Sequence, residues 1–202
     1  MGRALGYAPA PMAAEKEQEL PLFQPFATAQ AFLSVQEMDR LIADHSPLLS
    51  AGKLGLGNTN ATIRRSQVVF LGLEAKYKWL YDRLWAAAME CNRLFFCVDI
   101  AGVETNVQLA RYDSAERGFY DWHTDFAGIR PLRKLSVSIQ LSNAEDYEGG
   151  DLELLYGTEP HKLDRSRGAF IAFPSFMLHR VTPVTRGTRW SLVAWILGTR
   201  WR

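Results

Sequence analysis

The residues Lys134 to Leu141 alternate strictly between polar and apolar side chains, and this alternation constrains the fold more than any other feature. Successive side chains of a strand point to opposite faces, so the pattern predicts a β-strand with one apolar face. The same period of two continues from Glu104 onward. It predicts strands near residues 104–112, 119–125, 132–142, 151–156, 168–173, 177–184 and 188–197. Gly149-Gly150 and Arg186-Gly187 supply turn chemistry between them.

Two helices are expected before these strands. Ser34 and Glu37 match a capping box, S-x-x-E, and predict a helix with an apolar stripe of Met38, Leu41 and Ile42. Residues 74–95 follow a helical pattern that we expect to back a sheet. The residues on or near its apolar face are Trp79, Leu80, Leu84, Trp85, Ala88 and Leu94. SQVVFLGL, residues 66–73, reads as a short strand. The fold class is therefore α+β and mainly β: a β-sandwich or jelly roll braced by helices on one sheet.

The composition is that of a soluble globular protein, with 48 % apolar and 22 % charged residues in 202. The net charge of +1 gives no general attraction to nucleic acid or to an anionic membrane. No apolar run reaches the roughly 18 residues of a membrane span. We expect residues 1–21 to be a disordered N-terminal segment and residues 22–202 to form a single domain. The sequence leaves the oligomeric state open.

The N-terminus and the cysteines predict a cytoplasmic protein. The stretch from Met1 to Glu19 lacks a basic start followed by an apolar core, so we expect no secretory signal. Gly6 stands where an N-myristoylation motif needs Ser or Thr. Cys91 and Cys97 lie in one apolar segment without a CxxC partner. We interpret them as reduced core thiols rather than as a disulfide or a zinc site.

The stretch HTDF contains a candidate metal-binding pair, His123 and Asp125. Residues two apart share one face of an extended strand. An imidazole and a carboxylate on one face are two members of the 2-His-1-carboxylate triad, which holds non-haem Fe(II) and leaves open coordination positions. The second histidine must come from a distant strand. His161 lies in a polar stretch that reads as a loop, whereas His179 lies in an apolar segment, so we favour His179. The alternatives are a surface His-x-Asp pair and a core histidine.

Ten residues after His179 stands Arg189, on the last predicted strand. There it shares a face with Ser191, Val193 and Trp195 by the period of two. A buried guanidinium is unfavourable unless it is paired. A ligand carboxylate held in bidentate fashion, with a hydrogen bond from Ser191, would pair it. The alternative is an internal ion pair with Asp or Glu.

The joint pattern of His123-x-Asp125, His179 and Arg189 resembles the Fe(II)- and 2-oxoglutarate-dependent dioxygenases, in the prolyl 4-hydroxylase-like branch that includes the PKHD-type hydroxylases. Three longer stretches are similar to that branch: FLSVQEMDRLI, RYDSAERGFYDWHTD and RKLSVSIQLSNAEDYEGGDLEL. The resemblance covers roughly residues 30–199. It implies a double-stranded β-helix, the jelly-roll fold also called cupin-like.

The resemblance also implies a site and a reaction. Fe(II) would be held by His123, Asp125 and His179. The C5 carboxylate of 2-oxoglutarate would meet Arg189, with Ser191 and Tyr112 helping. O2 would be a further co-substrate and ascorbate a stimulatory reductant. The reaction implied is hydroxylation of an unactivated C–H bond in an amino acid, peptide or protein side chain, with release of succinate and CO2.

One agreement with the family and one departure from it refine this expectation. Related halogenases have a small residue at the position of Asp125, so the aspartate favours hydroxylation. The strand SIQLSN lacks the tyrosine that the family often places near the C5 carboxylate. The contacts of the co-substrate beyond Arg189 therefore stay open.

Substrate residues are the least constrained part of the sequence. The candidate wall residues are Gln108, Trp122, Asn58, Asn60, Arg64 and Arg65. Two arginines and two amides suit a substrate that bears a carboxylate. The glycine-rich stretch 51–66 is a candidate lid that closes over the iron and excludes water. The alternatives are a mobile surface loop and two solvated arginines.

Two other functions are compatible with such a fold. The first is a cupin-like metal enzyme that does not use 2-oxoglutarate, and the spacing of Arg189 argues against it. The second is a non-catalytic sensor or binding module, and the complete triad argues against that.

Overall fold

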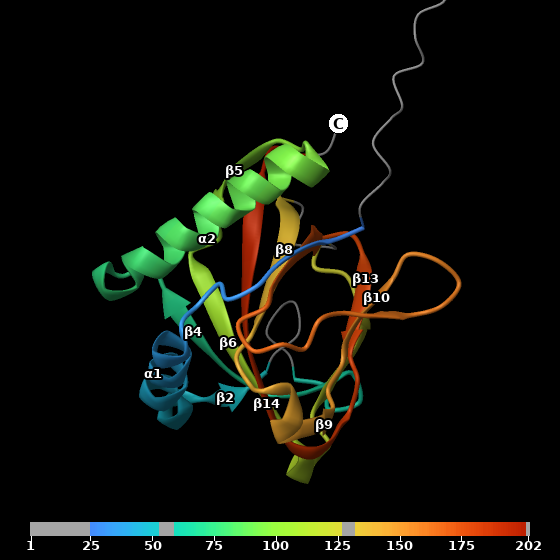
Figure 1. The fold of residues 1–202 in the computed structure, drawn as a ribbon. Coiled ribbons are helices and arrows are strands. Elements are labelled where there is room, and N and C mark those ends of the chain that lie inside the picture. Colours follow the sequence, from blue (N-terminus) through green and yellow to red (C-terminus); the bar gives the residue numbers. More distant parts are fainter. Residues whose placement is uncertain (1–24, 53–58, 127–131, 201–202) are drawn as a thin grey trace, which may run out of the picture.

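The computed structural model describes residues 25–52, 59–126 and 132–200 (Figure 1). The expected disordered segment 1–21 and the candidate wall residue Asn58 lie outside these residues. The helices are α1 (Val35–His45) and α2 (Lys78–Cys91), and a π-helical turn at Asn92–Phe96 continues α2. Short 3₁₀ turns lie at Ser46–Leu48, Ala75–Tyr77, Ser114–Glu116 and Ala144–Asp146.

Two facing sheets form the body of the molecule. The strands are β1 (Ala27–Ala29), β2 (Ser50–Ala51), β3 (Arg64–Arg65), β4 (Gln67–Gly72), β5 (Ile100–Val103), β6 (Asn106–Asp113), β7 (Phe119–His123), β8 (Arg133–Gln140), β9 (Tyr147–Gly149), β10 (Leu152–Leu155), β11 (His161–Lys162), β12 (Phe170–Pro174), β13 (Leu178–Val181) and β14 (Val184–Gly198). The larger sheet has the order β1-β12-β8-β14-β6-β4-β2, with β5 and β9 also paired to β14. The smaller sheet has the order β11-β10-β13-β7-β3.

Both helices lie on the outer face of the larger sheet (Figure 1). Leu80, Leu84 and Ala88 of α2 are fully buried in one apolar cluster with Leu109 of β6 and Leu192 of β14. The predicted sandwich, braced by helices on one sheet, is therefore confirmed. A second apolar cluster fills part of the space between the two sheets.

Two residues of the predicted α2 face point elsewhere. Trp79 is 37 % exposed and packs under the guanidinium of Arg83, and Leu94 is 52 % exposed. Leu94 lies in the π-helical turn that follows Cys91. A π-helical turn holds more residues than an α-helical turn, so the apolar stripe loses its phase there. Tyr81, which the pattern did not single out, takes a buried place and donates to the Leu71 carbonyl at 2.7 Å.

The capping box at the start of α1 is confirmed. The Glu37 amide donates to Ser34 Oγ at 3.2 Å, and the Ser34 amide donates to Glu37 Oε2 at 2.8 Å. The same carboxylate accepts two hydrogen bonds from the Arg83 guanidinium, at 2.8 and 2.9 Å. Glu37 therefore closes the first turn of α1 and ties that helix to α2.

Glu37→Gln should destabilise the protein by about 1 kcal/mol near neutral pH, in the range of a lost helix cap. The hydrogen bonds from Arg83 lower the pKa of Glu37 from 4.5 to about 2. A lowered carboxyl pKa stabilises the fold above the unfolded-state value, and this contribution is lost as the pH falls toward the folded-state value. The gap between wild type and variant should therefore shrink as the pH falls below about 4.5. Urea unfolding at neutral pH and near pH 3 measures this difference in the free energy of unfolding. A difference that stays constant would contradict the stabilising role of the ionised Glu37 carboxylate.

The alternating strand β8 is buried on both faces. Leu135, Val137 and Ile139 belong to the apolar cluster under the helices, while Ser136 and Ser138 line a cavity between the sheets. The polar half of the alternation is therefore an interior face and not a solvent-facing one.

Arg186-Gly187 is not a turn, so that prediction is wrong. β14 runs without a break through both residues: Val184–Gly187 pairs with β9, and Thr188–Val193 pairs with β6. Gly187 has φ +69°, and a Cβ there would lie 1.9 Å from the Asp146 carbonyl oxygen. The glycine thus permits a bend within one strand. The connection between the two sheets lies earlier, at residues 182–183, between the end of β13 at Val181 and the start of β14 at Val184.

Both cysteines are free thiols, as expected. Only Cys91 is half-buried, whereas Cys97 is exposed, so the prediction of two core thiols is wrong for Cys97. Cys97 ends the π-helical turn in the left-handed region, which carries the chain away from the helix. Within the described ranges, no helix has the length and apolar character needed to cross a membrane.

Candidate metal centre

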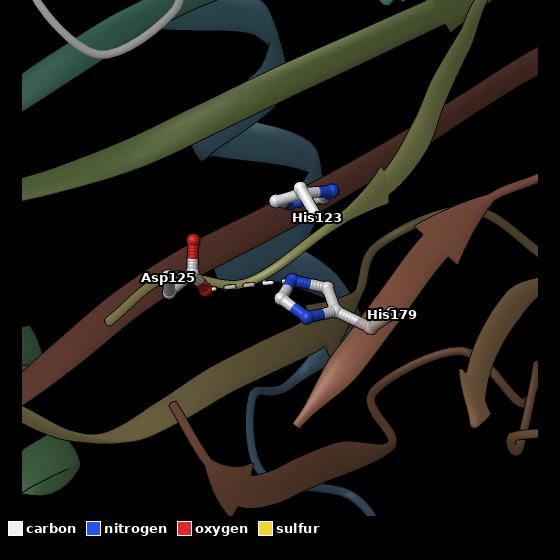
Figure 2. Close-up of side chains that lie close together, drawn as sticks. All are labelled: His123, Asp125 and His179. Atoms are coloured by element: carbon white, nitrogen blue, oxygen red, sulfur yellow. Dashed lines mark ion pairs between the residues drawn. The ribbon is translucent and has the colours of Figure 1, made fainter. Parts of the chain in front are cut away.

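His123, Asp125 and His179 converge at one end of the smaller sheet (Figure 2). His123 ends β7, and His179 stands opposite it on the paired strand β13. One ligand atom from each of the three residues lies within 4.8 Å of the other two. His179 Nε2 is 3.5 Å from Asp125 Oδ2, the contact drawn as a dashed line in Figure 2.

Asp125 belongs to this cluster, but its backbone is not the predicted strand. The strand expected over 119–125 ends at His123, so Asp125 does not share a strand face with it. Asp125 lies in a bend, where its amide and that of Phe126 both donate to the Ser175 carbonyl, at 3.0 and 3.1 Å. The bend turns the carboxylate back toward the two histidines.

Both imidazoles are held in the tautomer that suits a metal ligand. His123 Nδ1 lies 2.7 Å from the Asp121 carbonyl, and His179 Nδ1 lies 2.9 Å from the Met177 carbonyl. A carbonyl oxygen only accepts, so each Nδ1 carries a proton, and Nε2 is the ring nitrogen left for a metal ion. This backbone anchoring of the second ring nitrogen is the usual support of a metal-binding histidine.

The charges of the cluster also fit a divalent cation. Burial, followed by the neighbouring His179, lowers the pKa of His123 to about 3, so that imidazole is neutral. Burial alone would raise the pKa of Asp125. The imidazoles of His179 and His123 and the Ser136 hydroxyl outweigh it, and the net pKa lies below its ordinary value. An ionised carboxylate beside neutral imidazole is the donor set of non-haem iron sites.

A bulge in β7 decides which side chains surround His123. His179 pairs with His123 but Val181 pairs with Tyr120, so β7 has one residue more than β13 between these pairs. Tyr120 and His123 therefore stack face to face, with ring centroids 3.5 Å apart. Trp122 is turned away and packs under Arg180, 4.5 Å from its guanidinium carbon. The prediction of Trp122 as a wall residue is wrong because of this bulge.

A cavity of about 460 Å³ lies between the sheets, and the cluster forms part of its wall. Its lining includes the three candidate ligands and the sequence-predicted residues Arg64, Gln108, Tyr112, Arg189 and Ser191. Asn60 and Arg65 do not line it. The Asn60 side chain accepts from the Thr62 amide at 3.0 Å, and Arg65 donates to the Glu116 carbonyl at 3.0 Å.

The described flanks of the candidate lid are held by backbone pairing. β3 pairs with β7 at Tyr120 and Phe119, and the Gly52 amide donates to the Ser66 carbonyl at 2.7 Å. Arg64 is buried, donates to Ser66 Oγ at 2.7 Å and lies over the Tyr120 ring. It is a fixed wall residue and not a solvated one. The central part of the stretch, residues 53–58, lies outside the described residues.

Arg189 is 1 % exposed and lines the cavity. Its guanidinium donates to Gln140 Oε1 at 2.9 Å and to Ser191 Oγ at 3.3 Å, and it faces the Tyr112 ring at 5.4 Å. Among the residues that the structure describes, its Nε has no hydrogen-bond partner, and the partners of the guanidinium are neutral groups rather than Asp or Glu. A buried cation held only by neutral groups needs an anion. A ligand carboxylate would meet that need, and the internal ion pair considered as the alternative is not found among the described residues.

Two groups of residues around the site were not singled out from the sequence. Gln140 and Ser136 belong to the polar half of the β8 alternation, which would have indicated them once that face was known to point inward. Arg133 donates to Glu104 at 2.7 Å and lies 3.6 Å from the centre of the Trp195 ring. That grouping depends on strand pairing between distant segments, and no local signal indicates it.

Comparisons with known proteins agree with this geometry. Residues 107–197 match the sequence model of the 2OG-Fe(II) oxygenase superfamily. A PKHD-type hydroxylase of Synechococcus sp. (strain JA-2-3B'a(2-13)) is 35 % identical over 122 residues, which cover 57 % of this chain and 53 % of that protein. Another, of Burkholderia ambifaria (strain AMMD), is 31 % identical over 157 residues, 72 % of this chain and 65 % of that protein. The chain thus spans about half the length of the first of these relatives.

Solved structures show the same fold. A prolyl hydroxylase from Trichoplax adhaerens, in complex with a hypoxia inducible factor oxygen degradation domain peptide fragment, has a TM-score of 0.73 at 22 % identity. The match covers 86 % of this chain and 84 % of that one. The viral collagen prolyl hydroxylase of Paramecium Bursaria Chlorella virus-1, in a 2OG complex, has a TM-score of 0.64 at 22 % identity. It covers 87 % of this chain and 97 % of that one. The expected double-stranded β-helix is therefore confirmed.

Proposed function

We propose that this chain, whose residues 107–197 match the sequence model of the 2OG-Fe(II) oxygenase superfamily, is a member of that superfamily and an Fe(II)- and 2-oxoglutarate-dependent hydroxylase. It would convert 2-oxoglutarate, O2 and a C–H bond into succinate, CO2 and a C–OH group. One oxygen atom enters the new hydroxyl and the other enters succinate. The substrate we propose is a side chain of an amino acid, peptide or protein.

The observation that carries the proposal is the pairing of two unlike features in one cavity. One feature is a group of two imidazoles, each anchored at Nδ1 by a backbone carbonyl, beside an ionised carboxylate. The other feature is the buried Arg189 guanidinium, which has no carboxylate partner among the described residues. A cupin-like metal enzyme that acts without 2-oxoglutarate has no use for the second feature.

Each residue then has a defined task. His123, Asp125 and His179 would hold Fe(II). Arg189 and Ser191 would bind the C5 carboxylate, and the Tyr112 ring would close one side of that pocket. Bound iron, 2-oxoglutarate and O2 supply the oxidising chemistry. The burial of Arg189, Ser191 and Tyr112 keeps water from the co-substrate, which strengthens the charge–charge contact.

Within the substrate class, a prolyl residue of a peptide or protein is our first choice. Curated relatives are named PKHD-type hydroxylases, and one structural neighbour is a prolyl hydroxylase in complex with a peptide fragment. The cavity falls in the usual size range of small-molecule sites and could hold a co-substrate with one side chain. Free amino acids are the alternative that the experiment must distinguish.

Titration of the protein with Fe(II) and 2-oxoglutarate under nitrogen should give a visible absorption band that appears only when both are present. Addition of O2 with proline-containing peptides should then release succinate, and free amino acids should release less. Metal binding without the band would favour the enzyme that does not use 2-oxoglutarate. A band without succinate release from any peptide or amino acid would favour the non-catalytic module.

A further inference from the structure

Asp125 differs from the two histidines in how it is held. His123 and His179 stand on paired strands, whereas Asp125 lies in a bend beyond the end of β7. A side chain on a bend lacks the support of strand pairing on both sides. The position of its carboxylate must therefore be fixed by other contacts.

Ser136 of β8 and Ser175, which follows β12, supply these contacts. Ser136 Oγ lies 2.7 Å from Asp125 Oδ2 and 3.0 Å from Ser175 Oγ. An ionised carboxylate only accepts, so the single Ser136 proton is directed to Asp125. Ser136 must then accept its second hydrogen bond from Ser175. The result is a relay with one direction, from Ser175 to Ser136 to Asp125.

Backbone hydrogen bonds hold both serines in place. Ser136 stands on β8, which pairs with β12, and Ser175 directly follows β12. The Ser175 amide donates to the Lys134 carbonyl at 2.9 Å, and the Ser175 carbonyl accepts the amides of Asp125 and Phe126. The two serines are 1 % and 0 % exposed. A single residue, Ser175, thus holds the bend through its backbone and supports the carboxylate through its hydroxyl.

The other neighbours of the carboxylate lie farther away. Arg133 is 3.8 Å from Asp125 Oδ1 and directs its Nε to Glu104, and His179 Nε2 is 3.5 Å from Oδ2. Among the described residues, the Ser136 hydroxyl therefore makes the closest side-chain contact to the Asp125 carboxylate. A hydrogen bond to a buried charge in a low dielectric both stabilises the charge and restricts its rotation.

We propose that Ser136 and Ser175 are positioning residues for a metal-binding Asp125. They fix the rotation of its carboxylate so that one oxygen stays directed at the histidines before the metal arrives. The proposal rests on the metal centre of the proposed function, but not on its co-substrate. It makes the relay a determinant of metal affinity and not only of folding.

The probe is Co²⁺, titrated into the metal-free protein by calorimetry, so that the readout does not depend on activity. Ser136→Ala should weaken Co²⁺ binding about 10- to 100-fold, the usual effect of losing an outer partner of a metal ligand. Ser175→Ala should weaken it less, because the Ser136 hydroxyl remains. Ser136→Thr keeps the hydroxyl and should restore most of the affinity.

Ser142→Ala is the matched control for the loss of a buried serine hydroxyl. Ser142 accepts from the Trp190 amide at 2.8 Å and donates to the Thr188 carbonyl at 3.2 Å, away from the metal cluster. This variant should lower the free energy of unfolding in urea and leave Co²⁺ affinity unchanged. If Ser136→Ala does not fold, Ser175→Ala and Ser136→Thr carry the same comparison.

The outcomes separate the relay from the proposed function. Wild-type Co²⁺ affinity in both Ser136→Ala and Ser175→Ala would overturn the relay, even where iron and 2-oxoglutarate still give the visible band. Weakened affinity in these variants, with no band in the wild type, would support the relay and overturn the use of 2-oxoglutarate. A wild-type protein that binds no Co²⁺ would overturn both.

Discussion

Replacing Asp125 or His179 with alanine should abolish turnover and weaken metal binding by more than about 100-fold. Loss of a residue that only supports a metal ligand usually weakens binding by up to about 100-fold, and loss of the ligand itself should weaken it more. Each residue supplies one of three ligand atoms that lie within 4.8 Å of one another. A site with open coordination positions has no spare protein ligand to take over. The fold should persist, since the apolar clusters do not include Asp125 or His179. Calorimetric titration with Co²⁺ and measurement of succinate release test the two effects.

His161→Ala is the control for these variants. His161 is exposed on β11, and its ring packs 5.5 Å from those of Phe26 and Tyr156, outside the cavity. Its loss should leave metal affinity and turnover near the wild-type values. Turnover like that of the wild type in Asp125→Ala or His179→Ala would remove the triad assignment.

Arg189→Ala should raise the Kd and the KM for 2-oxoglutarate while leaving metal affinity close to normal. Loss of a buried partner of a charged group costs roughly 2–5 kcal/mol, which corresponds to about 30-fold to several thousand-fold in Kd. The guanidinium does not touch the three candidate ligands; its partners are Gln140 and Ser191. Anaerobic titration of the visible band with 2-oxoglutarate measures the change.

Arg186→Ala is the matched control on the same strand. Arg186 forms an exposed ion pair with Glu148, at 2.8 Å, outside the cavity. Such surface pairs contribute little to stability, so the variant should bind 2-oxoglutarate normally. An unchanged 2-oxoglutarate affinity in Arg189→Ala would mean that the arginine has a structural role only. Arg189→Lys keeps the positive charge but loses the paired N–H donors that hold a carboxylate. Its affinity for 2-oxoglutarate should therefore lie between those of the wild type and Arg189→Ala.

Local patterns in the sequence predicted most of the elements because their causes are local. The alternation of β8, the Ser34–Glu37 capping box and the face shared by Arg189 and Ser191 each depend on a few neighbouring residues, and each is found. The errors arise where the backbone departs from regular geometry. The π-helical turn turns Leu94 outward, and Gly187 bends a strand that was expected to end.

In the candidate site, too, the features with local causes were predicted and those that depend on distant segments were not. His123, Asp125, His179 and Arg189 were chosen from spacing and strand character, and the structure brings all four to one cavity. Trp122 was misplaced because the bulge in β7 depends on its partner β13. Gln140 and the Ser136–Ser175 relay depend on which strands become neighbours. That information lies in the pairing of distant segments, which no single-sequence pattern contains.

The position of β14 has a consequence for the folding kinetics of the protein. This strand lies between β6 and β8, and its partners all precede it in the chain, with Arg189 opposite Tyr112 and Ser191 opposite Gln140. These pairings join residues far apart in the sequence and so give a high contact order. High contact order slows folding, because long loops lose conformational entropy before their contacts form. We therefore expect slow, cooperative folding in which the arginine pocket forms only when the central sheet closes. A ligand bound there would then add to the free energy of global unfolding, rather than stabilise a separate, locally folded part.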